Sequence, residues 1–211
     1  VNTGVTDWIP GRQATNSGSS SDKLVALPFK LHLDTEEVTI AEVLRENGYS
    51  TMISGKWHLG ADPKFWPENQ GFDKNKGGYG AGQPNKINLS NGYFSPYGNP
   101  RLEDGAEGEY LTDRQTDEAI KFIENSGNKP FFVYLSYYAV HNPMQGKEKL
   151  VQKFTHKADS MGLTKKEAYT KNKEWIRESM SDNFTERIIQ SNPVYAAMSY
   201  SVDENIGNLV A

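Results

Sequence analysis

The sequence predicts an α/β fold with a mostly parallel central sheet flanked by helices. Residues 39–60 have the pattern of a helix–strand unit, and residues 110–143 repeat that order. The second strand, within residues 130–140, is almost continuously apolar, which is typical of a parallel strand covered on both faces. Two strands do not complete a sheet, so we expect further elements of this fold to lie outside these residues.

The first helix is expected directly after an irregular segment, residues 1–38, which is interrupted by glycine, proline and a serine-rich run. Thr39 and Glu42 have the spacing of a capping box, in which each side chain satisfies an amide of the other residue. Gly48 is placed to end the helix. The expected apolar stripe of this helix comprises Ile40, Val43 and Leu44.

A short strand, residues 49–54, follows this helix because its residues are β-branched, aromatic or apolar. Gly55 closes the strand, and Lys56-Trp57-His58-Leu59-Gly60 forms a turn beyond its carboxyl end. The two glycines free the turn to expose its polar side chains. Lys56 and His58 are two residues apart, so in an extended backbone their side chains would share a face.

Residues 61–109 contain many of the 19 glycines and 10 prolines, interspersed with aromatic residues. A segment of this length without a period indicates a large functional loop or a small satellite subdomain. Its glycine-rich part, residues 77–82, does not lie between a predicted strand and a helix, so we do not interpret it as a phosphate cradle.

The second helix–strand unit, residues 110–143, begins with a helix over residues 112–125 whose inner face carries Ala119, Ile120 and Ile123. The strand that follows ends at His141-Asn142-Pro143. Residues 147–190 are charged and are expected to be a helical insertion. Asn192-Pro193 then has the pattern of a helix cap and first turn, which predicts a helix over residues 193–211. The chain begins without Met and ends inside this helix, so we expect it to be a piece of a longer protein.

Composition excludes several classes of function. The 211 residues carry a net charge of −4, which does not favour a general nucleic-acid binder or a polybasic membrane anchor. No apolar run approaches the ~20 residues of a membrane helix. With no cysteine, the chain has no disulfide, no cysteine-ligated zinc and no thiol nucleophile.

Lys56, His58 and His141 are the candidate site residues, because each follows a predicted strand. Ligands of open α/β sheets bind beyond the carboxyl ends of the strands. One lysine and two histidines around a tetrahedral anion suit sulfuryl or phosphoryl transfer. In these reactions a cation stabilises the developing negative charge and a histidine transfers a proton. From spacing alone, a histidine after a strand is more often a structural group, and we assign His32 and His156 to that class.

The segment from Gly48 to Gly60, GYSTMISGKWHLG, resembles the second signature of the sulfatase family, the formylglycine-dependent members of the alkaline-phosphatase superfamily. Gly71-Phe72-Asp73 resembles the family's motif after that signature. Residues 129–143 resemble the strand that delivers a catalytic histidine, and residues 195–207 resemble the helix after it. The resemblance covers nearly the whole chain and implies that residues 1–211 are the central part of one catalytic domain with an alkaline-phosphatase-like sandwich.

The resemblance also implies roles for the candidate residues. Lys56 would bind a sulfate oxygen and the formylglycine side chain, and His58 would hydrogen-bond the hydrated formylglycine and help expel sulfate. His141 would contact the ester oxygen and protonate the leaving alcohol. Trp8 and the aromatic loop, residues 61–98, would offer a stacking surface for a sugar, although core packing explains these aromatic residues equally well.

The family's nucleophile motif, Cys- or Ser-x-Pro-x-Arg, does not occur in the sequence, and its Ca²⁺ ligands have no matching positions. The expected site therefore has no metal ligand in these residues, and the Ca²⁺ and the formylglycine are expected to be held by polypeptide outside them, so that the 211 residues alone are inactive. The expected substrate is a sulfated carbohydrate or an aryl sulfate, and the resemblance implies a periplasmic or secreted protein. A phosphoester or phosphonate hydrolase of the same superfamily and a non-catalytic homologue that binds sulfated glycans remain alternatives.

Overall fold

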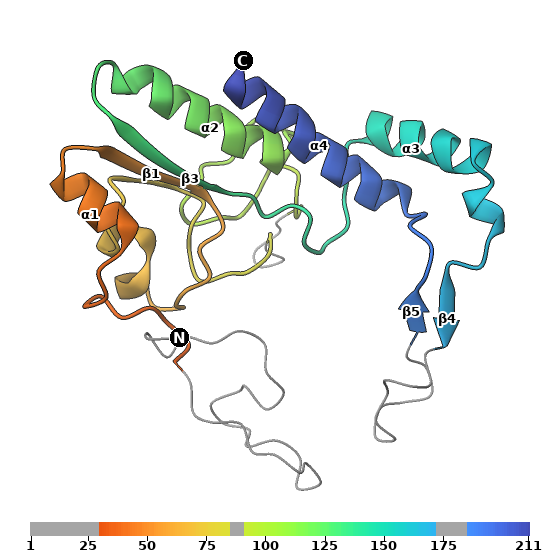
Figure 1. The fold of residues 1–211 in the computed structure, drawn as a ribbon, viewed down its shortest axis with the longest axis horizontal. Helices are drawn as coiled ribbons and strands as arrows, with labels where there is room; N and C mark the ends of the chain where they lie inside the picture. Colours follow the sequence, from red (N-terminus) through yellow and green to blue (C-terminus); the bar gives the residue numbers. More distant parts are fainter. Residues whose placement is uncertain (1–29, 85–90, 172–184) are drawn as a thin grey trace, which may run out of the picture.

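A computed structural model describes residues 30–84, 91–171 and 185–211. Its centre is a parallel sheet of three strands in the order β2 (Lys74–Lys76), β1 (Ser50–Gly55) and β3 (Phe131–Ser136). Helices α1 (Ile40–Glu46) and α2 (Leu111–Ser126) cover opposite faces of this sheet (Figure 1). The predicted α/β class with a parallel sheet between helices is confirmed.

The helix α1 begins as the sequence predicts. The Thr39 hydroxyl accepts a hydrogen bond from the Glu42 amide at 3.1 Å, and the Glu42 carboxylate accepts one from the Thr39 amide at 2.7 Å. Gly48 follows the last turn with a φ of 85°, the left-handed conformation that favours glycine. The predicted apolar stripe does not face the core, however, because Ile40 is 66% exposed and Val43 is 46% exposed.

The strand β1 is the buried centre of the sheet. Residues 51–55 are all buried, and β1 pairs with β2 on one side and β3 on the other. The sequence analysis missed β2, because the residues Lys74–Lys76 carry no apolar side chain to indicate a strand. The rest of the segment 61–109 contains two single-turn 3₁₀ helices, Pro63–Phe65 and Pro67–Asn69.

The strand β3 is less covered than its apolar sequence predicts. Phe131 is 43% exposed and Tyr134 is 47% exposed, so the expectation of burial on both faces is wrong for the described residues. The physical reason is position: β3 is the end strand of the sheet and pairs only with β1 within the described part of the chain.

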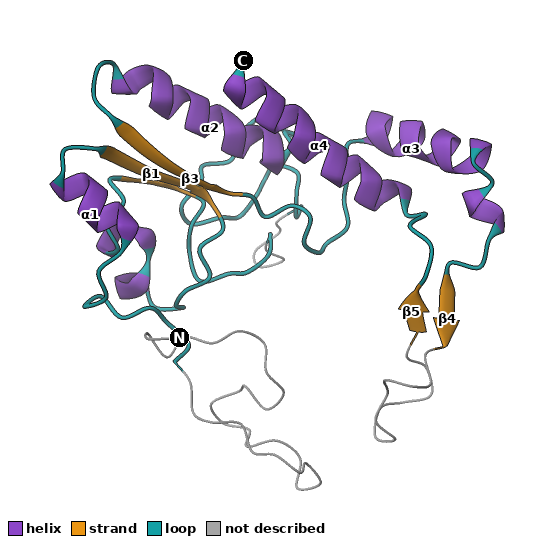
Figure 2. Cartoon of the chain, viewed as in Figure 1, coloured by secondary structure: helices purple, strands orange, loops and turns teal. Residues whose placement is uncertain are grey.

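The segment 147–190 is only partly helical. Helix α3 (Glu148–Ser160) and the 3₁₀ turn Leu163–Lys165 are followed by β4 (Tyr169–Lys171), which pairs antiparallel with β5 (Thr185–Arg187). The prediction of a helical insertion is therefore right for α3 and wrong where β4 and β5 pair, as Figure 2 shows. The prediction relied on two sets of apolar positions. Leu150, Val151 and Phe154 lie in α3, whereas Trp175, Ile176 and Met180 lie outside the described residues.

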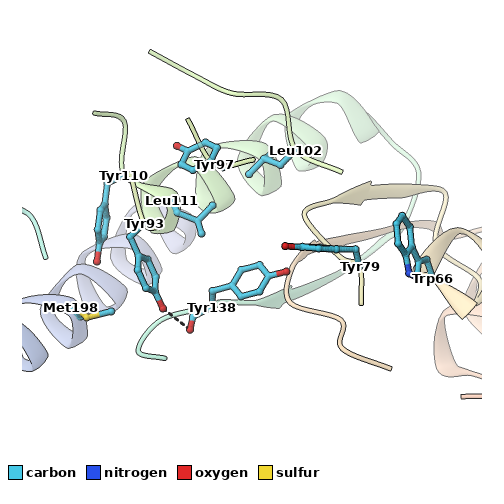
Figure 3. Packing of buried hydrophobic residues seen from close by; sticks show 9 residues of the cluster. All are labelled: Trp66, Tyr79, Tyr93, Tyr97, Leu102, Tyr110, Leu111, Tyr138 and Met198. Carbon is cyan, nitrogen blue, oxygen red and sulfur yellow. Dashed lines mark hydrogen bonds between the residues drawn. The ribbon is translucent and has the colours of Figure 1, made fainter. Parts of the chain in front are cut away.

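The last helix, α4 (Pro193–Val210), has its predicted cap: the Asn192 side chain accepts hydrogen bonds from the amides of Val194 at 2.9 Å and Tyr195 at 3.2 Å. It packs against α2 and α3. The main core cluster is aromatic and lies beneath the loops that follow the strands (Figure 3). None of the described helices has the length and apolarity required to span a bilayer.

Candidate active site at the carboxyl edge of the sheet

The loops after β1 and β3 leave the sheet joined to each other. The Lys56 amide donates to the Ser136 carbonyl oxygen at 2.7 Å, and the Ser136 hydroxyl donates to the Lys56 carbonyl oxygen at 2.7 Å. Gly55 has a φ of 121°, and a Cβ added there would lie 2.0 Å from the Ser136 oxygen. The glycine before Lys56 is therefore required both by its conformation and by the close approach of the two backbones.

His58 adopts a backbone conformation that the sequence analysis did not predict. Its φ is 62°, and it is the one residue other than glycine with a positive φ in the described part of the chain. The backbone is therefore not extended at His58, so the condition on which the expected shared face of Lys56 and His58 depended is not met. Unfavourable backbone conformations of this kind concentrate at functional sites, where the surrounding structure holds them in place.

Two contacts hold His58 in this conformation. Its amide donates to the Tyr79 carbonyl oxygen at 3.0 Å. Gly82 lies against the imidazole, because a Cβ added to Gly82 would lie 2.5 Å from His58 Cε1. The glycine-rich segment that we did not interpret as a phosphate cradle thus forms a wall against the imidazole of His58.

His141 lies five residues beyond the end of β3, and its imidazole is exposed. Its amide donates to the Tyr138 carbonyl oxygen at 3.0 Å, which closes a tight turn. The Tyr93 hydroxyl shares its proton between the carbonyl oxygens of Tyr138 at 2.8 Å and His141 at 2.9 Å. The position of His141 therefore depends on a side chain from the long loop rather than on the strand itself.

Four buried tyrosines of the core cluster lie in a row (Figure 3). It consists of Tyr79, Tyr138, Tyr93 and Tyr110, and we call it the tyrosine row. The backbone carbonyl of Tyr79 accepts a hydrogen bond from the His58 amide, and the hydroxyl of Tyr93 donates one to the His141 carbonyl oxygen. The Tyr138 hydroxyl donates to the Gly77 carbonyl oxygen at 2.8 Å. The row therefore links the loop after β1, the segment after β2 and the loop after β3.

Burial raises the pKa of the Tyr93 hydroxyl well above its usual value, and burial raises the pKa of the Tyr138 hydroxyl in the same way. Both hydroxyls therefore keep their protons at neutral pH and act as donors to backbone carbonyls. The sequence analysis did not single out these tyrosines, because Tyr93 and His141 are 48 positions apart and no local pattern joins them. The signal available was an aromatic residue in a glycine-rich loop, which core packing also explains.

The sequence-predicted residues thus fall into two groups. Lys56, His58 and His141 all lie in loops at the carboxyl edge of the sheet, with Lys56 half-buried and both histidines exposed. Trp8 lies outside the described residues, and nothing in the structure bears on its expected stacking role.

The residues described do not fit a Ca²⁺ site. Across residues 30–84, 91–171 and 185–211, no three histidine, aspartate or glutamate side chains are grouped so that they could hold a metal ion. Asp113, the acidic residue of the first turn of α2, instead accepts hydrogen bonds from Lys147 at 3.1 Å and Asn205 at 2.7 Å. Its carboxylate joins α2, α4 and the chain that follows His141.

The chain is similar in sequence to known sulfatases. The Sulfatase family model matches residues 8–211. The chain is 25% identical to an arylsulfatase of Klebsiella aerogenes over 86% of its own length and 44% of that enzyme. It is 30% identical to the N-acetylgalactosamine-6-sulfatase of the dog, Canis lupus familiaris, over 65% of its own length and 27% of that enzyme. The chain therefore spans less than half of the length of these relatives.

Solved structures share the fold over part of their length. The crystal structure of Ps i-CgsB in complex with k-i-k-neocarrahexaose superimposes with a TM-score of 0.55 and 25% identity, over 96% of this chain and 38% of that one. The putative sulfatase yidJ from Bacteroides fragilis has a TM-score of 0.56 at 20% identity, over 85% of this chain and 40% of that one, a likeness of fold alone.

Proposed function

The chain belongs to the sulfatase family, and we propose that it is the central part of a sulfuric ester hydrolase whose active site contains Lys56, His58 and His141. One observation carries the proposal: reciprocal hydrogen bonds between Lys56 and Ser136 bring the loops after β1 and β3 out of the sheet together. A cation and two imidazoles at one edge of a sheet suit an anionic, tetrahedral sulfuryl group.

Lys56 is assigned to the sulfuryl oxygens. Its ammonium group carries a positive charge. The backbone of Lys56 cannot shift without breaking the hydrogen bond between its amide and the Ser136 carbonyl oxygen. As the sulfuryl group is transferred, negative charge is redistributed over its oxygens, and a cation already in place stabilises that charge without reorganisation. Such preorganised contacts act mainly on turnover rather than on ground-state binding.

The two histidines are assigned to proton transfer at opposite ends of the reacting group. When the bond between sulfur and the ester oxygen breaks, its electron pair goes to that oxygen. The His141 imidazolium donates its proton to the same oxygen, so that the product leaves as a neutral alcohol. His58 is assigned to the side of the attacking oxygen, where its imidazole accepts a proton.

The attacking group is proposed to come from polypeptide outside these residues. By resemblance to this family, a formylglycine would supply the attacking oxygen and Ca²⁺ would supply positive charge, and both would be held by polypeptide outside these residues. The sequence has neither a cysteine nor a Ser-x-Pro-x-Arg motif, and the described residues form no metal site. Lys56, His58 and His141 are accordingly assigned to binding, orienting and protonating the substrate.

A sulfated carbohydrate is proposed as the substrate. The relative of known structure with 25% identity was crystallised with a neocarrahexaose, an oligosaccharide. The tyrosines of the long loop are buried in the core, so they support the loops at this edge of the sheet rather than offer a stacking surface for the sugar.

Paired esters test this function in the full-length protein. We expect hydrolysis of an aryl sulfate to exceed hydrolysis of the matching aryl phosphate. His141→Ala should reduce turnover most for alkyl sulfates, by roughly 10²–10⁴-fold, because a poor leaving group needs a proton. Activated aryl sulfates should be affected less. A preference for phosphate would indicate a phosphoester hydrolase, and binding of sulfated glycans without turnover would indicate a non-catalytic homologue. An equal loss on both sulfate classes would contradict the acid role of His141.

A further inference from the structure

A cleft of about 530 Å³ opens beside the loop that carries His141. Its lining includes Asn91, Phe94, Glu107, Pro143 and Gln145. The volume lies within the range of sites that bind small molecules.

Two tyrosines of the tyrosine row, Tyr93 and Tyr110, connect the lining of the cleft to the loop that carries His141. Tyr93 lies next to Phe94 in the chain, and its hydroxyl donates to the His141 carbonyl oxygen at 2.9 Å. The Tyr93 amide donates to the Gln145 side-chain oxygen at 2.9 Å, and the Tyr110 hydroxyl donates to the Gln145 carbonyl oxygen at 2.9 Å. Two segments of the lining, those of Phe94 and of Gln145, are therefore held by hydrogen bonds to buried tyrosines, so this part of the cleft is formed before a ligand binds.

The lining has the chemistry of a site for a neutral, hydroxyl-rich ligand. Phe94 supplies an aromatic surface and is itself supported by Tyr110, with ring centroids 5.2 Å apart. Asn91 and Gln145 supply carboxamides, which both donate and accept hydrogen bonds. Glu107 is exposed, makes no ion pair with any described residue, and adds a carboxylate that accepts from hydroxyl groups.

The same lining disfavours an anion. Neither lysine, arginine nor histidine is among the described residues that line the cleft, whereas Glu107 contributes a negative charge. A sulfate or carboxylate placed in the cleft would lose hydration without gaining a counter-charge. The positive charge of the candidate site is instead on Lys56, at the end of β1.

We propose that this cleft is a subsite for an uncharged sugar residue linked to the sulfated residue, on the side of the leaving alcohol. The inference rests on the proposed function, because it places the sulfated sugar beside Lys56 and its neighbour beside Pro143. The subsite determines specificity. The protein selects oligosaccharides in which the sugar next to the sulfated one is uncharged, because the carboxylate of Glu107 repels a second negative charge there.

A charge reversal tests the specificity directly. In the full-length protein, kcat/KM is measured for tetrasaccharides that carry one sulfate and for otherwise identical tetrasaccharides with a second sulfate on the neighbouring residue. Glu107→Lys should raise the ratio of doubly to singly sulfated kcat/KM roughly tenfold. Glu124→Lys makes the same charge change at an exposed position in the last turn of α2, near the start of β3, and should leave the ratio unchanged. Equal ratios in wild type and Glu107→Lys would overturn the proposal.

A truncation tests the contact itself. The double substitution Asn91→Ala and Glu107→Ala removes two exposed polar side chains, together with a long hydrogen bond of 3.5 Å from Asn91 to the Ser95 carbonyl oxygen. It should lower kcat/KM on the singly sulfated tetrasaccharide roughly 30-fold, since two hydrogen bonds to the sugar are lost together. Hydrolysis of 4-nitrophenyl sulfate, which has no second sugar, should stay within about twofold. A tetrasaccharide rate equal to that of the wild type would contradict the proposal.

A binding measurement separates this inference from the proposed function. If the full-length protein hydrolyses no sulfate ester, the proposed function fails, and the subsite is judged by ligand-observed NMR with the desulfated tetrasaccharides. Binding that the double substitution weakens supports a neutral-sugar site. Binding that is absent, or that the substitution leaves unchanged, overturns it.

Discussion

The two strands that deliver the candidate site residues differ in how they hold them. β1 is buried along residues 51–55, and Lys56 follows it directly with its backbone tied to Ser136. β3 is an end strand with exposed aromatic side chains, and His141 lies five residues beyond it. Tyr93, a residue of the long loop, holds the His141 carbonyl.

We call the loop that carries Lys56 the β1 arm and the loop that carries His141 the β3 arm. The two arms of the candidate site are held by different physical interactions. The β1 arm depends on strand burial and on a glycine that permits close backbone approach. The β3 arm depends on hydrogen bonds from a buried hydroxyl to backbone carbonyls. A substitution can therefore disturb one arm and leave the other intact, which makes the two arms experimentally separable.

The largest expected effect comes from breaking the β1 arm at Gly55. Gly55→Ala places a Cβ 2.0 Å from the Ser136 oxygen on a backbone with a φ of 121°. Overpacking and backbone strain together should lower the free energy of unfolding by roughly 4 kcal/mol, measured by urea denaturation of the full-length protein.

Gly48→Ala is the matched control for this prediction. Gly48 also has a positive φ, 85°, but no atom lies within 4 Å of an added Cβ. Its cost should be about 1 kcal/mol, from backbone conformation alone. Equal losses for the two variants would mean that the junction of β1 and β3 adjusts without penalty, and the close backbone approach at Gly55 would then not hold the β1 arm.

A smaller structural effect and a large kinetic one are expected at Lys56. Lys56→Ala removes the side chain but keeps both hydrogen bonds that the backbone of residue 56 makes to Ser136, so folding should be nearly unchanged. Turnover of sulfate esters should fall roughly 10²–10³-fold, as in the loss of one oxyanion contact. Lys129→Ala, at an exposed position before β3, should have wild-type kinetics. Wild-type turnover in Lys56→Ala would remove Lys56 from the site.

The smallest effect on turnover is expected from a substitution that weakens the hydrogen bonds of the β3 arm. Tyr93→Phe leaves the His141 carbonyl without its hydroxyl donor, while the Tyr138 carbonyl keeps only the His141 amide, which should lower the free energy of unfolding by about 1–2 kcal/mol. Because His141 is then less well placed, kcat on alkyl sulfates should fall several-fold while KM changes little.

Tyr97→Phe provides the comparison for Tyr93→Phe. Tyr97 is similarly buried, but its hydroxyl donates to Glu109 rather than to the His141 loop. It should lower stability without a selective loss on alkyl sulfates. The positioning role of Tyr93 would be refuted if the two variants had the same kinetic profile.

The sequence was sufficient for elements whose signals are local. The capping box of α1, the cap of α4 and the glycine at the end of β1 were each predicted to within a residue, because neighbouring residues determine them. The order of loops that carry Lys56, His58 and His141 follows from the same alternation of helices and strands.

The remaining features depend on contacts between distant segments. β2 has no apolar residue and exists because its backbone pairs with β1. The left-handed conformation of His58 depends on Tyr79 and Gly82, more than twenty positions along the chain. The exposure of β3 depends on which strands lie beside it, and its own sequence cannot specify that.

The central claim is that Lys56, His58 and His141 contact one sulfuryl group. The most direct test is a crystal structure of the full-length protein with an uncleaved sulfate ester bound. We predict that the ammonium nitrogen of Lys56 and a ring nitrogen of each histidine lie within about 3.2 Å of oxygen atoms of the ester. A bound ester that any of the three side chains does not reach would contradict the claim.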